Sequence, residues 1–76
     1  MKARQARELA IKAMDKDTEY HNELERVYKE IENKANKGCL SIYINIPYRY
    51  HDYVSTKLVE NGYNVGIVFE KFEISW

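Results

Sequence analysis

Residues 39–53 read CLSIYINIPYRYHDY, and the rest of the chain can be placed relative to this stretch. Large apolar side chains alternate there with small or polar ones, which is the period of a β-strand with one face in a core. Pro47 ends the strand because proline has no backbone N–H to give to a sheet. The pattern therefore predicts a strand that is covered on one side only. The side chains expected to face the core are Leu40, Ile42, Ile44 and Ile46, and those expected on the other face are Cys39, Ser41, Tyr43 and Asn45.

The chain before this strand has the pattern of amphipathic helices. Apolar residues recur every three or four positions over residues 3–36, with charged residues between them. The apolar pattern weakens at Asp17, a residue type that often caps a helix N-terminus. We therefore expect a break or bend near 15–17 that separates helices over about 3–14 and 18–36, with one kinked helix as the alternative.

The second predicted helix carries an apolar stripe of Leu24, Val27 and Ile31. We expect this stripe to pack on the sheet, and a coiled-coil seam with another chain is the alternative. The helix is expected to end at Asn36, because Gly38 can take the left-handed conformation that closes many helices.

A short helix and a second strand are predicted after the proline loop. The helix is expected over about 52–61, with His51 or Asp52 as its N-cap. Gly62 is expected to stop it. The strand is expected over 63–69, and its core-facing side chains are expected to be Val65, Ile67 and Phe69.

The C-terminal residues alternate again, but in the opposite phase. Phe72, Ile74 and Trp76 are the apolar positions, and a slip of one residue moves every side chain to the other face of a sheet. A bulge near Glu70 and Lys71 keeps both sets inward in one long strand, whereas a tight turn makes a hairpin. We favour the bulge, because Glu-Lys is poor turn chemistry. The three apolar residues are expected to form strand and to be buried by the helices or by a neighbouring subunit.

These elements predict a two-layer α/β domain of order α-β-α-β, with a small sheet of two or three strands. The single domain covers residues 1–76, helical over 3–36 and strand-helix-strand over 39–76, and the strand-helix-strand part is expected to be a parallel βαβ unit. One sheet face is left bare, and a 76-residue core is marginal, so we expect a homo-oligomer, a dimer or larger. The interface residues are expected to include Tyr43, Val68, Phe72, Ile74 and Trp76.

Composition excludes several classes of function. Twelve basic and twelve acidic residues cancel, which argues against the long basic surface that non-specific nucleic-acid binding needs. One cysteine and two distant histidines make no metal-ligand cluster, and no cofactor motif is present. No apolar run reaches membrane-spanning length, and residues 1–14 lack the apolar core of a signal peptide. The chain is expected to be soluble and intracellular.

The chain contains five short motifs: Ile31–Gly38, Ser41–Ile44, Val54 with Leu58, Asn61–Val65 and Ile74–Trp76. These motifs resemble those of small, mostly uncharacterised proteins of tailed bacteriophages. The similarity extends from about Ala6 to the C-terminus and includes a Gly-Tyr-x-Val strand and a terminal Ile-Ser-Trp. It implies a phage accessory protein in the host cytoplasm with an α-β-α-β order, and it implies no activity.

The loop after the strand carries the candidate binding site. A ligand crevice in a βαβ unit lies beyond the carboxyl end of the strand, and the following helix N-terminus favours anions. Arg49 can bind a phosphate with its forked guanidinium group, and tyrosine rings can stack on a base. The alternative for the tyrosines is packing at a subunit interface. The predicted ligand-binding residues are Tyr48, Arg49, Tyr50, His51, Tyr53 and Lys57.

Two functions follow from these features, and neither is enzymatic, because no catalytic side-chain spacing is present. In the first, an oligomer binds a cyclic nucleotide or a related second messenger and acts as an anti-defence sponge. In the second, the protein is an effector that binds a host protein through its bare sheet face or its N-terminal helix. Long nucleic acids and membranes are not expected partners in either case.

Overall fold

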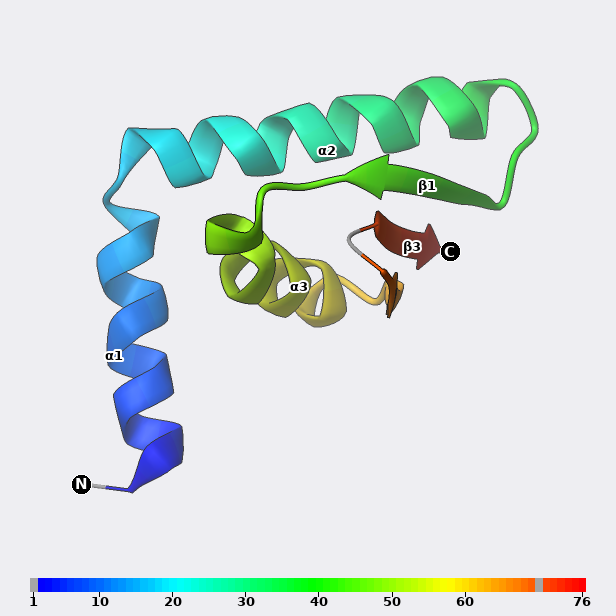
Figure 1. Ribbon diagram of the computed structural model, residues 1–76. Helices are drawn as coiled ribbons and strands as arrows, with labels where there is room; N and C mark the ends of the chain where they lie inside the picture. Colours follow the sequence, from blue (N-terminus) through cyan, green and yellow to red (C-terminus); the bar gives the residue numbers. More distant parts are fainter. Residues whose placement is uncertain (1, 70) are drawn as a thin grey trace.

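The computed structural model describes residues 2–69 and 71–76 (Figure 1). The described chain has the expected α/β class, with three α-helices and one three-stranded sheet. The elements, in order, are α1 (Ala3–Asp15), α2 (Thr18–Asn36), β1 (Ser41–Asn45), a 3₁₀ turn (Tyr48–Tyr50), α3 (His51–Glu60), β2 (Asn64–Val68) and β3 (Lys71–Ser75).

The strand order is β1-β3-β2, so the C-terminal strand lies in the middle of the sheet. β1 and β2 each pair antiparallel with β3. They therefore run parallel to each other, as a βαβ unit requires, but they are not neighbours. The expectation of a simple parallel βαβ unit is corrected in this respect, because β3 is inserted between its two strands.

β2 and β3 form a hairpin, and our preference for a bulged single strand is wrong. Val68 pairs with Lys71 across a two-residue connection. Directly opposed residues of two paired strands point to the same face of the sheet. Positions 68 and 71 are opposed but differ by an odd number, so the apolar residues fall on odd positions before the hairpin and on even positions after it. Phe69 in the connection has a φ of 59°, a conformation that bulky side chains seldom adopt. Glu70, one of the two residues at which a bulge was expected, lies outside the described residues.

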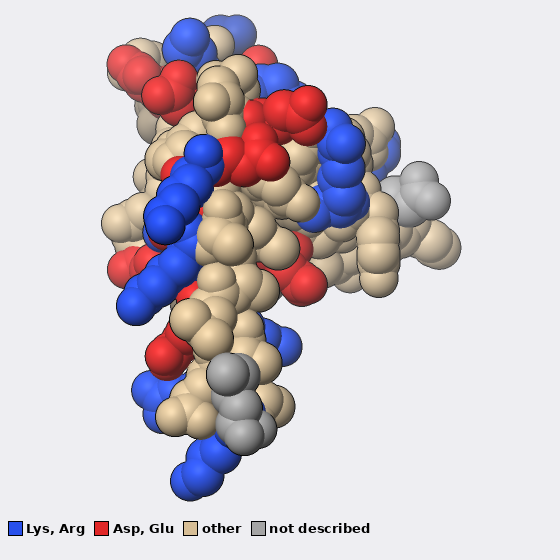
Figure 2. Space-filling model, turned by 90° about the vertical axis from the view of Figure 1, so that its left-hand side faces the viewer, with Lys and Arg blue, Asp and Glu red and all other residues tan. Residues whose placement is uncertain are grey.

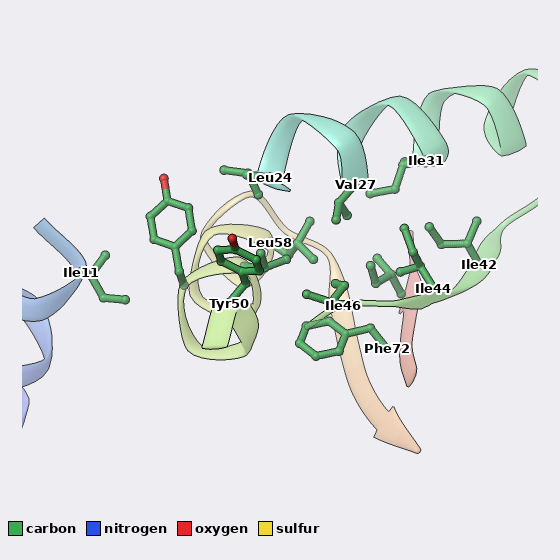
Figure 3. Packing of buried hydrophobic residues seen from close by; sticks show 13 residues of the cluster. Ile11, Leu24, Val27, Ile31, Ile42, Ile44, Ile46, Tyr50, Leu58 and Phe72 are labelled. Carbon is green, nitrogen blue, oxygen red and sulfur yellow. The ribbon is translucent and has the colours of Figure 1, made fainter. Parts of the chain in front are cut away.

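The hydrophobic core lies between the helices and one face of the sheet (Figure 3). Ile42 is opposite Ile74 and Ile44 is opposite Phe72 in the β1–β3 register, so all four face the helices. The predicted α2 stripe packs there, which confirms its core role. The buried residues are Ile11, Leu24, Val27, Ile31, Ile42, Ile44, Ile46, Tyr50, Tyr53, Val54, Leu58, Phe72 and Ile74.

Three residues predicted to face the core are exposed instead. Leu40 lies just before β1 and is 73% exposed. Ile67 is 55% exposed because it lies on an edge strand that the ten-residue helix α3 covers only in part. Phe69 has left the strand at the hairpin connection and is 95% exposed. Only Val65 of the predicted second-strand set packs, half-buried, against the core.

The predicted helix break is confirmed. The Asp17 side chain caps α2 by accepting a hydrogen bond from the backbone N–H of Glu19 at 2.9 Å. The chain turns sharply there, and α1 projects away from the rest of the molecule (Figure 1). The principal extents are 44 × 23 × 22 Å, and Ile11 is the one buried residue among those described in α1. We call α1 the projecting helix.

Glycines follow the ends of α2 and α3, as expected. Gly38 has a φ of 85° after α2, and the N–H of Cys39 donates to the Lys34 carbonyl at 3.0 Å. Gly62 has a φ of 89° after α3.

The predicted cap at the start of α3 is wrong, since neither His51 nor Asp52 occupies the cap position. The 3₁₀ turn leads directly into α3, and Tyr50 stands at its N-cap without a side-chain cap.

Candidate functional site

The six residues predicted to bind a ligand do not converge on one site. Tyr53 and Lys57 face the helical layer, where both reach Asp15 at the end of the projecting helix. The Tyr53 ring is fully buried and its hydroxyl donates to Asp15 Oδ1 at 2.9 Å. Lys57 Nζ lies 3.0 Å from the same oxygen. These two side chains therefore connect the end of α1 to α3.

Asp15 was not predicted as a partner of either residue, because the sequence does not show that the end of the first helix meets α3. The hydrogen bond from Lys57 holds the pKa of Asp15 below its ordinary value of 3.8, against the opposing effect of burial, and the Tyr53 hydroxyl adds to the lowering. Burial, followed by the hydrogen bond to Asp15, raises the pKa of Tyr53 to about 12. The cluster of Asp15, Tyr53 and Lys57 is a structural junction.

Arg49 and Tyr50 of the 3₁₀ turn form a second group, which contacts the first turn of α2. Arg49 donates to Glu19 Oε2 at 3.1 Å and to the Tyr50 hydroxyl, and its guanidinium lies 4.6 Å from the Tyr50 ring centroid. The hydrogen bond to Tyr50 raises the pKa of Arg49. Tyr50 is buried edge-on against Tyr20, with 5.1 Å between ring centroids. Arg49 is thus already paired with an acid of its own chain.

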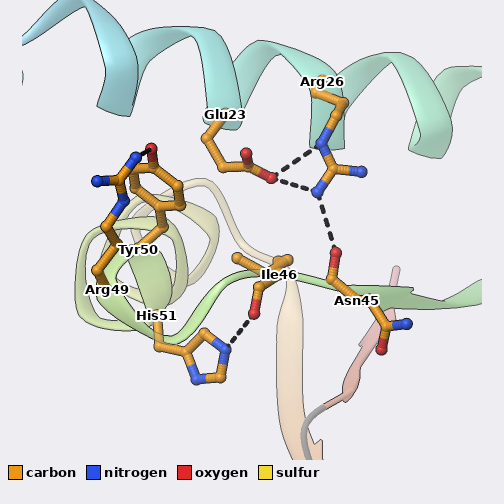
Figure 4. A network of polar contacts seen from close by, with 7 residues as sticks. All are labelled: Glu23, Arg26, Asn45, Ile46, Arg49, Tyr50 and His51. Atoms are coloured by element: carbon orange, nitrogen blue, oxygen red, sulfur yellow. Dashed lines mark hydrogen bonds and ion pairs between the residues drawn. The ribbon is translucent and has the colours of Figure 1, made fainter.

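His51 and Tyr48 lie beyond the C-terminal end of β1. His51 Nε2 donates to the Ile46 carbonyl oxygen at 2.6 Å, and its ring packs edge-on against Phe72 at 4.7 Å (Figure 4). The Tyr48 ring lies 5.3 Å from the His51 ring and is 88% exposed. Among the six predicted residues, Tyr48 is therefore the most available ring for stacking.

A hollow of about 650 Å³ lies beyond the carboxyl end of β1, where the predicted crevice belongs. Its cation is Arg26 of α2, which sequence reasoning missed. Arg26 pairs with Glu23 and donates to the Asn45 carbonyl oxygen at 3.0 Å (Figure 4). The one available signal was that Glu23 and Arg26 are spaced to pair along a helix. The lining residues are Glu23, Arg26, Asn45, Ile46, Pro47, Tyr48 and His51.

The sheet face opposite the helices is uncovered in the described chain. Side chains alternate along strands, so the partners of the buried row point to this face. Tyr43 is 66% exposed there, and Val68 is also exposed. A second hollow, of about 780 Å³, lies on this face. It is lined by Tyr43, Asn45, Val68, Phe69 and Lys71.

The predicted interface residues divide between this face and the core. Tyr43 and Val68 lie on the uncovered face. Phe72 and Ile74 are fully buried inside the single chain, so they are not available at a surface. Trp76 is half-buried, with its ring 6.4 Å from that of Tyr63. The C-terminal strand was expected to be buried either by the helices or by a neighbouring subunit. In the single chain the helices bury Phe72 and Ile74.

Charge is unevenly distributed although the net charge is zero. Residues 2–16 contain five basic side chains and two acidic ones, and α2 is correspondingly rich in glutamate. Figure 2 shows blue side chains on both flanks of the projecting helix. Several acidic side chains are paired with a cation, including Glu8 with Arg4 at 3.4 Å.

No family model, curated protein or solved structure matches this chain. Over residues 2–69 and 71–76, no helix combines the length and apolar character needed to cross a membrane. The resemblance to bacteriophage proteins stays a prediction from the sequence. The two hollows and the uncovered sheet face are the surface features that could bind a partner.

Proposed function

We propose that this protein is a non-catalytic binding protein that contacts another protein through the uncovered face of its sheet. The observation that carries the proposal is the exposure of Tyr43, Val68 and Phe69 around one hollow on that face. Exposed aromatic and β-branched side chains gathered on a flat surface are typical of protein interfaces.

The polar residues of this face also favour a protein over an anionic small molecule. Lys71 and Glu73 lie two residues apart on the central strand and point to the same side. Their charges cancel locally, so the face offers no net positive potential to a phosphate. A role as an accessory protein of a tailed phage in the host cytoplasm belongs to the same proposal and depends on the sequence resemblance alone.

The test is site-specific photocrosslinking in cells. A photoreactive phenylalanine analogue replaces Tyr43 in one variant and Tyr48 in the matched control, because both tyrosines are exposed but Tyr48 lies away from the sheet face. We expect a discrete protein adduct from position 43 and little or none from position 48. Absence of any adduct at position 43 contradicts the proposal.

A second candidate function is the binding of a small anionic ligand, such as a cyclic nucleotide, in the hollow beyond β1. The specific observation is that the exposed Tyr48 ring and the Arg26 guanidinium line the same hollow. A base stacked on a tyrosine contributes on the order of 1–3 kcal/mol. An anion has to displace Glu23 from Arg26, so this candidate ranks second.

Thermal unfolding distinguishes this candidate from the first. Cyclic di- and trinucleotides and ADP-ribose derivatives are added to the wild type, Arg26→Ala and Arg49→Ala. A bound ligand raises the melting temperature of the wild type and of Arg49→Ala, but not that of Arg26→Ala. If no compound shifts the wild-type transition, the sponge function is rejected while the sheet-face proposal is unaffected.

A further inference from the structure

The uncovered sheet face has an internal pattern that the strand register makes visible. Three rows of side chains cross the three strands on this face, and the row of Ser41, Ser75 and Asn64 lies farthest from the β2–β3 hairpin. In each strand, the residues of the two rows nearer the hairpin complement each other by size or by charge. The first row is Tyr43, Glu73 and Gly66, and the second row is Asn45, Lys71 and Val68.

We infer that the partner on this face is a second copy of the chain, related by a two-fold axis that lies between the two sheets and perpendicular to the strands. This inference rests on the proposed function, since it names the partner of the same face. An axis at the level of Phe72 places the first row of one copy over the second row of the other. Lys71 then faces Glu73 of the second copy, and the symmetry repeats this contact.

The outer strands fit the same axis by size. Val68 of one copy lies over Gly66 of the other, where a Cβ added to the glycine meets nothing within 4 Å. Tyr43 lies over the smaller Asn45. Each large side chain is thereby placed against a small one, which lets two sheet faces approach to the usual distance of about 10 Å.

A two-fold axis in the other direction lacks this match. A two-fold axis parallel to the strands places Lys71 over Lys71 and Glu73 over Glu73, and like charges held face to face are unfavourable. An unrelated protein has no reason to match both rows at once. The pairing of Lys71 with Glu73 therefore supports a second copy and selects one axis.

The size of the sheet sets the strength expected for this dimer. Three strands about 4.8 Å apart and five residues long cover roughly 14 by 17 Å. That area is well below the roughly 800 Å² per partner of a standard interface. We therefore expect a dissociation constant in the micromolar range, and equilibrium sedimentation has to sample concentrations up to several hundred micromolar.

Charge reversal gives the decisive experiment. Lys71→Glu places two acids opposite each other at both symmetric contacts, and Glu73→Lys places two lysines there. Each variant alone is expected to raise the dissociation constant at least about tenfold. An equimolar mixture restores association, because each contact then joins an acid to a lysine. The double variant Lys71→Glu with Glu73→Lys restores self-association for the same reason.

Three outcomes overturn the inference. They are a wild-type monomer at all concentrations, single variants that associate like the wild type, and a mixture that fails to recover association. Circular dichroism checks that both variants are folded, as expected from side chains outside the core. The photocrosslinked adduct at position 43 keeps this test separate from the proposed function. An adduct of twice the 9.1 kDa chain mass supports the second copy, and an adduct with another protein alone rejects it but retains the sheet-face function.

Discussion

At the scale of single residues, one carboxylate joins the projecting helix to the rest of the molecule. Asp15 accepts hydrogen bonds from both Tyr53 and Lys57 of α3. The Tyr53 ring fills the core beneath it, so the junction combines packing with charge. A change at Asp15 therefore tests whether its hydrogen bonds to α3 help to hold α1 in place or whether the packing of Ile11 is sufficient.

The first prediction concerns acid stability. The folded-state pKa of Asp15 lies below its ordinary value of 3.8, so its contribution is fully present above pH 3.8 and is lost as pH falls through the folded value. Asp15→Asn is expected to cost about 1 kcal/mol at pH 7, after allowance for its partial exposure. The difference between wild type and variant should shrink as the pH is lowered toward 2 in urea titrations. A constant difference contradicts the assignment.

The second prediction concerns alkaline stability. The pKa of Tyr53 is raised to about 12 from an ordinary 10.0, so the folded state favours its neutral form. Its contribution is complete below pH 10 and is lost as pH rises toward 12. Tyr53→Phe keeps the buried ring and removes the hydroxyl. The free energy of unfolding of this variant should therefore fall less between pH 10 and 12 than that of the wild type. Absorbance of tyrosinate in the folded wild type should also show one late-titrating group that the variant lacks.

The third prediction concerns the hairpin connection. Phe69 holds a left-handed conformation that costs most side chains roughly 1–2 kcal/mol, while its ring is 95% exposed. Phe69→Asn should stabilise the protein by about 0.5–1 kcal/mol, because asparagine tolerates this conformation. Tyr48→Asn removes an equally exposed ring at an ordinary backbone position and is the control. A lower urea midpoint for the Phe69 variant contradicts the strain argument.

At the scale of elements, local patterns predicted most of what is local. Periodicity located both N-terminal helices, their break near Asp17, the first strand and α3 to within a residue or two. It did not give the strand order, because the central position of β3 depends on pairing with β1, about thirty residues earlier. Local alternation carries no information about which strands become neighbours.

The candidate site shows the same limit. The crowded loop at 48–53 was recognisable from composition, but the acids that pair with Arg49 of this loop and with Lys57 of α3 lie on other elements. Glu19 reaches Arg49 from α2, and Asp15 reaches Lys57 from α1. Such contacts join residues thirty or more positions apart. They decide whether a cation is available to a ligand, and a single sequence does not display them.

The fourth prediction follows from the central place of β3. Deleting residues 72–76 removes Phe72 and Ile74, both fully buried, and leaves β1 and β2 without the strand that pairs with them. A core of this size seldom contributes more than about 3–5 kcal/mol, so cooperative unfolding should disappear. Deleting Trp76 alone is the control, because β3 stays complete. A truncated chain that still melts cooperatively contradicts this assignment.

At the scale of the whole molecule, only one side of the sheet is covered. Helices α2 and α3 pack on that side and α1 projects beyond them, while the other side of the sheet is open. Pairing of two copies through the open face therefore leaves α1 of each copy uncovered. Binding through the sheet and display of the basic helix are compatible in one assembly.

The loose attachment of α1 also has a consequence for local unfolding. Beyond Ile11, Met14 and Asp15 the projecting helix makes few contacts, so it can open while the core stays closed. Backbone amides over residues 3–10 should exchange with solvent far faster than those of β3 in hydrogen-exchange measurements. Trypsin should cleave first after Arg4 and Arg7, leaving a protected remainder. Protection of these amides as strong as that of β3 contradicts the loose attachment of α1.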